Sequence, residues 1–86
     1  MNFIEASHFK RAYKSLPKEA QDRVKEALMA LAADSKHPSL HVKKIKGTYN
    51  IWEARAGLDY RITFQIVKDC FMLRNVGHHD LTLKNP

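Results

Sequence analysis

Two adjacent histidines, His78 and His79, follow Gly77 where an apolar run ends near the close of the sequence. The pKa of a free imidazole is about 6.5, so either ring could act as a general acid or base in phosphodiester cleavage. The pair could instead be two polar residues on the surface of a tail. A metal site is a third interpretation, but adjacent residues of a strand point to opposite faces, and no tetrahedral Cys/His spacing is present. We therefore expect no metal ion here.

Arg55 and Arg61 form a second pair that could do chemistry. Each lies in a short run of β-branched and aromatic residues, which is typical of a half-buried strand. A guanidinium fork can hold a scissile phosphate and stabilise the charge that builds on it in the transition state. The alternative is an ion-pair network with Glu53 and Asp59. Both interpretations can hold, because an acidic neighbour orients an arginine without removing its charge.

A basic segment spans residues 41–46, with the apolar Val42 and Ile45 inserted in it. Lysine ammonium groups bind backbone phosphates and release the counterions that surround a nucleic acid. The alternative is a solvated charged face with no partner. The cationic candidates of the segment are His41, Lys43, Lys44 and Lys46.

The distribution of charge also points to the second part of the chain. The formal net charge is +6, with seven Lys and Arg against five Asp and Glu up to residue 36, and eight against four from residue 37 onward. A basic protein favours an anionic partner, which could be a nucleic acid, an acidic protein or a membrane surface. The sequence has no phosphate-cradling glycine loop, nucleophilic serine motif or pair of catalytic carboxylates.

Length and composition predict a single domain over residues 1–86, because 86 residues of which 44% are hydrophobic can build one core. The one cysteine, Cys70, excludes an internal disulfide and a thiolate metal cluster, which fits a reducing cytoplasm. No window approaches the roughly 20 apolar residues of a membrane span, and the first residues do not read as a secretory leader. We expect a cytoplasmic protein with no membrane partner.

The spacing of apolar residues predicts the elements that must position these side chains. Residues 2–6 suit a short strand, and Ser7 is a candidate N-cap for a helix that Pro17 interrupts. A second helix is predicted over residues 17–35, where apolar residues recur at i, i+4, i+7, i+8 and i+11. Residues 37–47 break this periodicity and are expected to form a loop or a short strand.

Three strands separated by short turns are predicted in the remainder, over residues 50–56, 59–67 and 70–76. The chain is thus expected to be an α+β domain with an N-terminal strand, a helical hairpin and a three-stranded antiparallel meander. Alternation places Arg61 on a polar face with Thr63 and Gln65, and strand pairing allows Arg55 to lie near Arg61. The residues expected to face the helices are Tyr60, Ile62, Phe64 and Ile66.

In order and spacing, these segments resemble the RelE/ParE superfamily of small bacterial toxins from toxin–antitoxin modules, and within it the RelE, YafQ and YoeB branch. The motifs that carry the resemblance are KKIKG at 43–47, Asp-Tyr-Arg at 59–61 and Val-Gly-x-His-Asp at 76–80. The resemblance covers nearly the whole chain. It implies an antiparallel sheet backed by two helices, with a basic concave face.

The resemblance further implies a metal-independent endonuclease that cuts messenger RNA in the ribosomal decoding site, by attack of the RNA 2′-hydroxyl on the adjacent phosphate. Arg61 matches the arginine that binds the phosphate, and His79 matches a C-terminal histidine that acts as general acid. Arg55 falls where YafQ-like members place a second histidine. The basic segment lies where relatives carry the base, which makes Lys44 a catalytic candidate. The RNA-binding candidates are His41, Lys43, Lys46, Asp59 and His78.

The sequence departs from the pattern of the superfamily near its end. Leu83 stands about where many relatives have an aromatic residue that stacks on a base, so stacking would be lost or taken over by Tyr60 or Trp52. The sequence ends at Pro86, so we expect no further C-terminal helix. ParE-like members inhibit DNA gyrase and lack the nuclease residues, which leaves a gyrase inhibitor, a non-cleaving homologue or a plain RNA-binding module as alternatives.

The partners that the resemblance implies are a cognate antitoxin, messenger RNA and the ribosome. No cofactor, metal or small molecule is expected. An antitoxin of acidic and partly disordered character would cover the basic face or pack against the helical hairpin.

Overall fold

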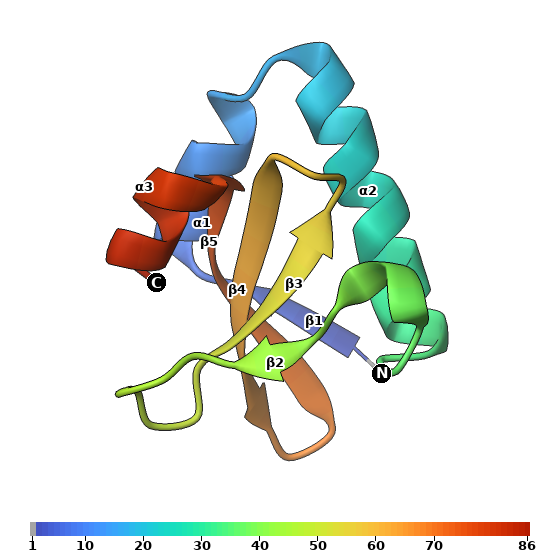
Figure 1. The fold of residues 1–86 in the computed structure, drawn as a ribbon, viewed down its shortest axis with the longest axis vertical. Coiled ribbons are helices and arrows are strands. Elements are labelled where there is room, and N and C mark those ends of the chain that lie inside the picture. The colour runs from blue at the N-terminus through green and yellow to red at the C-terminus, as the bar shows by residue number, and fades with distance from the viewer. Residues whose placement is uncertain (1) are drawn as a thin grey trace.

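One five-stranded sheet organises the computed structural model, which describes residues 2–86 (Figure 1). The strands lie in the order β1-β5-β4-β3-β2. In chain order the elements are β1 (Asn2–Glu5), α1 (Ser7–Lys14), α2 (Lys18–Ala33), the short 3-10 helix η1 (Pro38–Leu40), β2 (Lys43–Lys44), β3 (Trp52–Ala56), β4 (Tyr60–Val67), β5 (Cys70–His78) and α3 (His79–Lys84).

Strands β3, β4 and β5 form the predicted antiparallel meander in the middle of the sheet. Strand β1 pairs with β5 in the parallel direction. The sequence of its four residues does not determine this direction. The basic segment contributes β2, a strand of two residues at the edge beside β3. The predicted α+β class, with an N-terminal strand and two helices before the meander, is confirmed.

Helices α1 and α2 cover one face of the sheet, as their apolar spacing predicted (Figure 1). The N-cap prediction for the first helix is wrong: Ser7 is its first helical residue, because Ala6 keeps an extended backbone and accepts the Lys10 N–H. No helix within residues 2–86 is long and apolar enough to cross a membrane. The inward residues of α2 are Ala20, Val24, Ala27 and Leu31, all buried.

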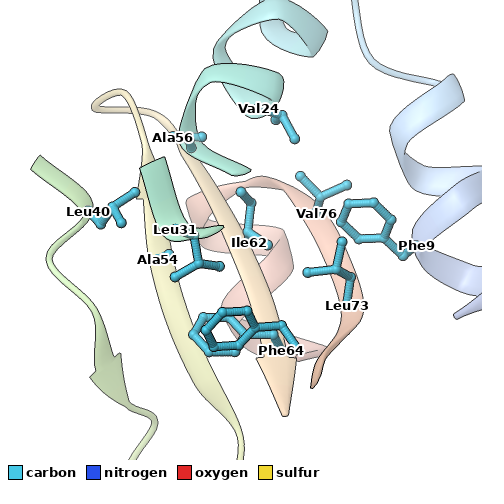
Figure 2. Packing of buried hydrophobic residues seen from close by; sticks show 12 residues of the cluster. Phe9, Val24, Leu31, Leu40, Ala54, Ala56, Ile62, Phe64, Leu73 and Val76 are labelled. Carbon is cyan, nitrogen blue, oxygen red and sulfur yellow. The ribbon is translucent and has the colours of Figure 1, made fainter. Parts of the chain in front are cut away.

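The core lies between these two helices and the inner face of the sheet (Figure 2). Phe64 of β4 is fully buried and meets Phe71 of β5 edge-on, with ring centroids 5.2 Å apart, a favourable geometry for aromatic pairs. Ile66 was expected to pack here but is 39% exposed, because it lines an open groove beside residues 35–38, after α2 has ended. The other large core residues are Phe9, Leu31, Leu40, Ile62, Leu73 and Val76.

A bulge in β5 turns two consecutive residues to the same side of the sheet. Thr63 pairs with Asn75 and Phe64 with Leu73, so Arg74 has no direct partner on β4. An extra residue of this kind shifts the phase of the alternation by one. Polar residues can therefore lie together on the face away from α1 and α2, while the apolar residues on either side of them stay in the core.

The short helix α3 packs on the face of the sheet opposite α1 and α2. Its buried Thr82 lies so close to Gly77 of β5 that a Cβ at Gly77 would stand 2.9 Å from Thr82 Oγ1. The prediction of no further helix after the last strand is wrong for residues 79–84. A helix of six residues has little stability of its own, so packing against the sheet, which the local sequence does not reveal, must stabilise it.

Candidate functional site

The outer face of the sheet, which we define as the face away from α1 and α2, carries the polar residues of the meander. Arg55 pairs with Arg61 and Glu53 pairs with Thr63 across β3 and β4, while Gly77 of β5 pairs with Arg61 on its other side. Residues that pair directly share a face of the sheet. The prediction that Arg55 and Arg61 lie beside each other is confirmed.

Arg61 is held firmly within the outer face. Its side chain is only 11% exposed, and its Nη1 donates to the carbonyl oxygens of Leu58 at 3.0 Å and Tyr60 at 2.9 Å. Its Nε lies 3.8 Å from a carboxylate oxygen of Glu53, which is also buried. The ion pair with Glu53 that the sequence suggested is therefore present. It leaves Arg61 less accessible than we expect of a residue that only binds phosphate.

The charges that act on Arg61 come from Arg55, Glu53 and Asp59. Burial lowers the pKa of the Arg61 guanidinium and the neighbouring Arg55 lowers it further, while Glu53 and Asp59 raise it. An arginine stays protonated in proteins, so two positive charges stand side by side on the outer face. The Nε of Arg61 is buried and has no hydrogen-bond partner within residues 2–86. An unpaired buried donor is costly, and this one is enclosed by the protein beside the Glu53 carboxylate.

Arg55 is the more accessible of the two arginines. It is half-buried and makes no ion pair within the described chain. It also lines a cavity of about 370 Å³ whose other walls come from α2, η1 and the turn after β3, including Arg23 and His41, so this cavity is not part of the outer face. Arg55 is therefore the guanidinium with both the exposure and the freedom to reach a ligand.

His79 stands at the start of α3, directly after β5. Its backbone N–H donates to the carbonyl oxygen of Asp59 at 2.8 Å, which fixes the start of α3 beside the turn between β3 and β4. Its Nδ1 lies 2.8 Å from a carboxylate oxygen of Asp80, and its side chain is 37% exposed. A carboxylate that accepts Nδ1–H orients the ring and leaves Nε2 free to exchange a proton with a ligand.

The rings of His78 and His79 lie on the same side of the chain, stacked with their centroids 4.6 Å apart. We expected them to point to opposite faces, and this expectation is wrong because the strand ends at His78 and the helix begins at His79. The ring of Tyr60 meets His78 edge-on, with centroids 6.2 Å apart. The junction of β5 and α3 thus gathers three ring side chains. Tyr60 and His78 pair directly, and alternation places them on the side of the buried Ile62 and Val76, opposite the arginines.

The basic segment does not converge on one point. Lys43 pairs with Glu53, which places it on the outer face with the arginines. Lys44 pairs with Trp52 and lies on the helix side, so the strand register does not bring it to Arg61. The two remaining candidates are exposed at the ends of the segment, and they are His41 and Lys46.

Aromatic residues near the site differ in their suitability for stacking. Tyr60 and Trp52 both lie on the helix side of the sheet: Tyr60 is half-buried beside His78, and Trp52 donates its Nε1–H to Asn50 Oδ1 at 3.2 Å. Leu83 is half-buried on α3. Of the two rings that could replace the aromatic residue of the relatives, Tyr60 is the one that lies beside the histidines.

Sequence reasoning missed the polar contacts that fasten the last residues to the outer face. Thr63 Oγ1 and Arg74 Nε both donate to the carbonyl oxygen of Pro86, at 2.9 and 3.0 Å. Asn75 Nδ2 donates to the carbonyl oxygen of Asn85 at 2.8 Å. Thr63 and Asn75 are buried, and buried polar groups in apolar strands require partners. Their presence in otherwise apolar runs was the available signal.

The sheet has two helices on one face and a pair of arginines on the other, and Arg61 pairs with Gly77, two residues before His79. Solved structures share this fold. A chain of the RelB–RelE antitoxin–toxin complex from Methanococcus jannaschii is 26% identical, with 96% of this chain and 99% of that chain covered and a TM-score of 0.75. The resemblance predicted from the sequence is confirmed.

Two more distant structures show the same fold. The YoeB dimer from Staphylococcus aureus is 13% identical, covering 92% of this chain and 97% of that chain, with a TM-score of 0.75. YafQ from E. coli is 13% identical, covering 94% of this chain and 96% of that chain, with a TM-score of 0.73. In structure, the chain therefore has the fold of the RelE, YoeB and YafQ toxins. No protein-family model and no curated protein matches the sequence itself.

Proposed function

We propose that this chain is the toxin of a toxin–antitoxin module and acts as a metal-independent endonuclease on messenger RNA. The observation that carries the proposal is the side-by-side placement of Arg55 and Arg61 on the outer face, next to the junction where Asp80 orients His79. Because Arg61 pairs with Gly77, two residues before His79, this arrangement offers positive charge for a phosphate and a proton donor near it along the sheet. It fits the chemistry of phosphodiester cleavage by an internal nucleophile.

Phosphate binding falls to the arginines. Arg55 reaches the phosphate directly, and the fixed guanidinium of Arg61 contributes positive charge beside it. Both charges stabilise the phosphorane-like transition state, whose equatorial oxygens carry more negative charge than the ground state. Glu53 keeps the Arg61 side chain in place through their contact at 3.8 Å.

Proton transfer completes the reaction. The RNA 2′-hydroxyl loses its proton to a base and attacks the adjacent phosphorus, and the bond from phosphorus to the 5′ oxygen breaks. His79, protonated at Nε2, gives its proton to that leaving oxygen, so the products are a 2′,3′-cyclic phosphate and a 5′-hydroxyl. Lys43 is the member of the basic segment that we favour as base, because it shares the outer face with the arginines.

The partners follow from the same proposal. A ribosome would present the messenger RNA to the outer face, and the excess of basic residues after residue 36 supports binding of an RNA backbone. A cognate antitoxin of acidic character would neutralise the toxin in the cytoplasm. Several of the similar structures are toxin–antitoxin complexes, including the archaeal RelE–RelB complex from Pyrococcus horikoshii.

A second function has one specific observation in its favour. Arg61 is largely buried and bonded to the backbone of its own turn, as a purely structural arginine would be. A homologue that binds RNA or another target without cleaving it is compatible with that geometry. A ParE-like gyrase inhibitor belongs to the same group of alternatives.

The discriminating experiment is induced expression in bacteria with mapping of RNA 5′ ends. We expect new 5′ ends within the coding regions of translated messages, absent from cells that express His79→Ala or Arg55→Ala. The control is His37→Ala, which changes an exposed histidine of the loop after α2 and should cut as the wild type does. Growth arrest without new 5′ ends, or with a DNA-damage response, would favour the second function.

A further inference from the structure

The junction between β5 and α3 presents three metal-ligating side chains in succession. His78 and His79 can each offer a ring nitrogen and Asp80 a carboxylate oxygen, and these atoms lie within 4.8 Å of one another. We propose that they form a binding site for one divalent transition-metal ion that prefers imidazole ligands, such as Zn²⁺. Such an ion would be an inhibitor of this protein and not a cofactor.

The backbone explains why consecutive residues can share one ion. Along a continuous strand His78 and His79 would point to opposite faces, but the chain changes from strand to helix between them. The change brings the two rings to one side with their centroids 4.6 Å apart. Asp80, the second residue of the helix, then turns its carboxylate toward His79, at 2.8 Å from Nδ1.

Two contacts hold the ligands in position before any ion arrives. The His79 backbone N–H is bonded to the carbonyl oxygen of Asp59, and the ring of Tyr60 packs edge-on against His78. Ligands supported by neighbouring elements lose less freedom when they bind. The side chain of Asp80 is 71% exposed, so it can rotate to close the site.

The donor set selects the metal. Two imidazoles with one carboxylate suit Zn²⁺, Cu²⁺ and Ni²⁺, whereas Mg²⁺ and Ca²⁺ prefer oxygen ligands alone. Ligands around tetrahedral zinc lie about 3.4 Å apart for bonds of about 2.1 Å, so atoms that now lie within 4.8 Å of one another must move closer by side-chain rotation. Three protein ligands leave one position open for water.

The functional consequence rests on the proposed nuclease activity, although metal binding itself does not. An ion bound to His79 occupies an imidazole nitrogen and draws Asp80 away from its orienting role. The ring then cannot give a proton to the leaving oxygen, so cleavage would stop while RNA binding by the arginines continues. Zinc would in this way silence the toxin without an antitoxin.

Isothermal titration of the full-length chain with ZnCl₂, followed by the visible spectrum of the Co²⁺ form, tests the site. We expect one ion per chain in the wild type, and binding weakened by at least about tenfold in both His78→Ala and Asp80→Asn. The matched control is His8→Ala, since His8 is exposed on α1 outside the junction, and it should bind zinc as the wild type does. MgCl₂ should give no saturable binding.

Two results would overturn the proposal: no saturable zinc binding by the wild type, or equal affinity in the wild type, His78→Ala and Asp80→Asn. Zinc inhibition of RNA cleavage is a separate measurement, made with and without EDTA. If the chain binds zinc at this site but cleaves no RNA, the metal site stands and the nuclease proposal fails. If it cleaves RNA and binds no zinc, the nuclease proposal stands and the metal site fails.

Discussion

At the scale of single residues, the candidate site depends on how two side chains are held. Arg61 is fixed by backbone carbonyls and by Glu53, so it contributes charge from a constant position. His79 is half-exposed and is oriented by its neighbour Asp80. Sequence reasoning identified both residues, because an arginine on a polar strand face and a histidine at a strand end carry recognisable chemistry. It missed that Arg61 would be buried.

Asp80 should act as a positioning residue for His79. We expect Asp80→Asn to lower kcat for RNA cleavage by about tenfold with little change in KM, because the ring loses its orientation while the arginines still bind the phosphate. Steady-state kinetics in the presence of EDTA measure both constants. Asp69→Asn, in the exposed turn before β5, is the control. An equal loss in KM would mean that Asp80 contributes to binding or stability instead.

Removing Arg61 should cost stability as well as activity. Arg61→Ala leaves the Glu53 carboxylate buried without its cationic partner, and we expect a loss of about 3 kcal/mol in the free energy of unfolding. Urea denaturation followed by circular dichroism measures it. The double variant Arg61→Ala/Glu53→Gln should recover part of the loss, because the second change removes the uncompensated charge.

A surface ion pair provides the comparison for that experiment. Arg23→Ala breaks the contact of Arg23 with Glu19 on α2, where both side chains are more than half exposed. Exposed pairs contribute at most about 1 kcal/mol. If Arg61→Ala proved as mild as Arg23→Ala, the buried pair would not be the support for Arg61 that its geometry indicates.

At the scale of elements, the helices and the meander could be predicted because their periodicity is local. Three features could not. The parallel pairing of β1 depends on contacts with β5, the bulge at Arg74 depends on the register with β4, and α3 is too short to be stable without the sheet. The face on which Lys44 lies could not be predicted either, because it depends on the register of β2 with β3. In that register Lys43 pairs with Glu53 and Lys44 with Trp52.

The close approach of Gly77 and Thr82 is a specific test of how α3 is seated. A methyl group at Gly77 would lie 2.9 Å from Thr82 Oγ1, so Gly77→Ala must displace the helix or strain it. We expect a loss of about 1 to 3 kcal/mol in stability. Chemical denaturation of the single variant and of Gly77→Ala/Thr82→Ala checks this, with the second change restoring most of the loss. A single variant as stable as the wild type would contradict the packing described.

At the scale of the whole molecule, the sheet separates two tasks. Its inner face and the two helices supply a core around Phe64 (Figure 2). Its outer face carries the arginine pair and receives α3. The excess of positive charge after residue 36 lies in the segments that form the sheet and the basic segment. Lys43, Arg55 and Arg61 of these segments lie on the outer face, which is why we propose it as the surface that meets an anionic partner.

The most direct test of the central claim is the chemistry of the cut. Purified protein should be incubated with messenger RNA on ribosomes in the presence of EDTA, and the ends of the fragments analysed. We predict a 2′,3′-cyclic phosphate and a 5′-hydroxyl at each cut, with the rate reduced by about 10² or more in His79→Ala because the general acid is lost. Uncut RNA, or cleavage at the wild-type rate by His79→Ala, would contradict the account.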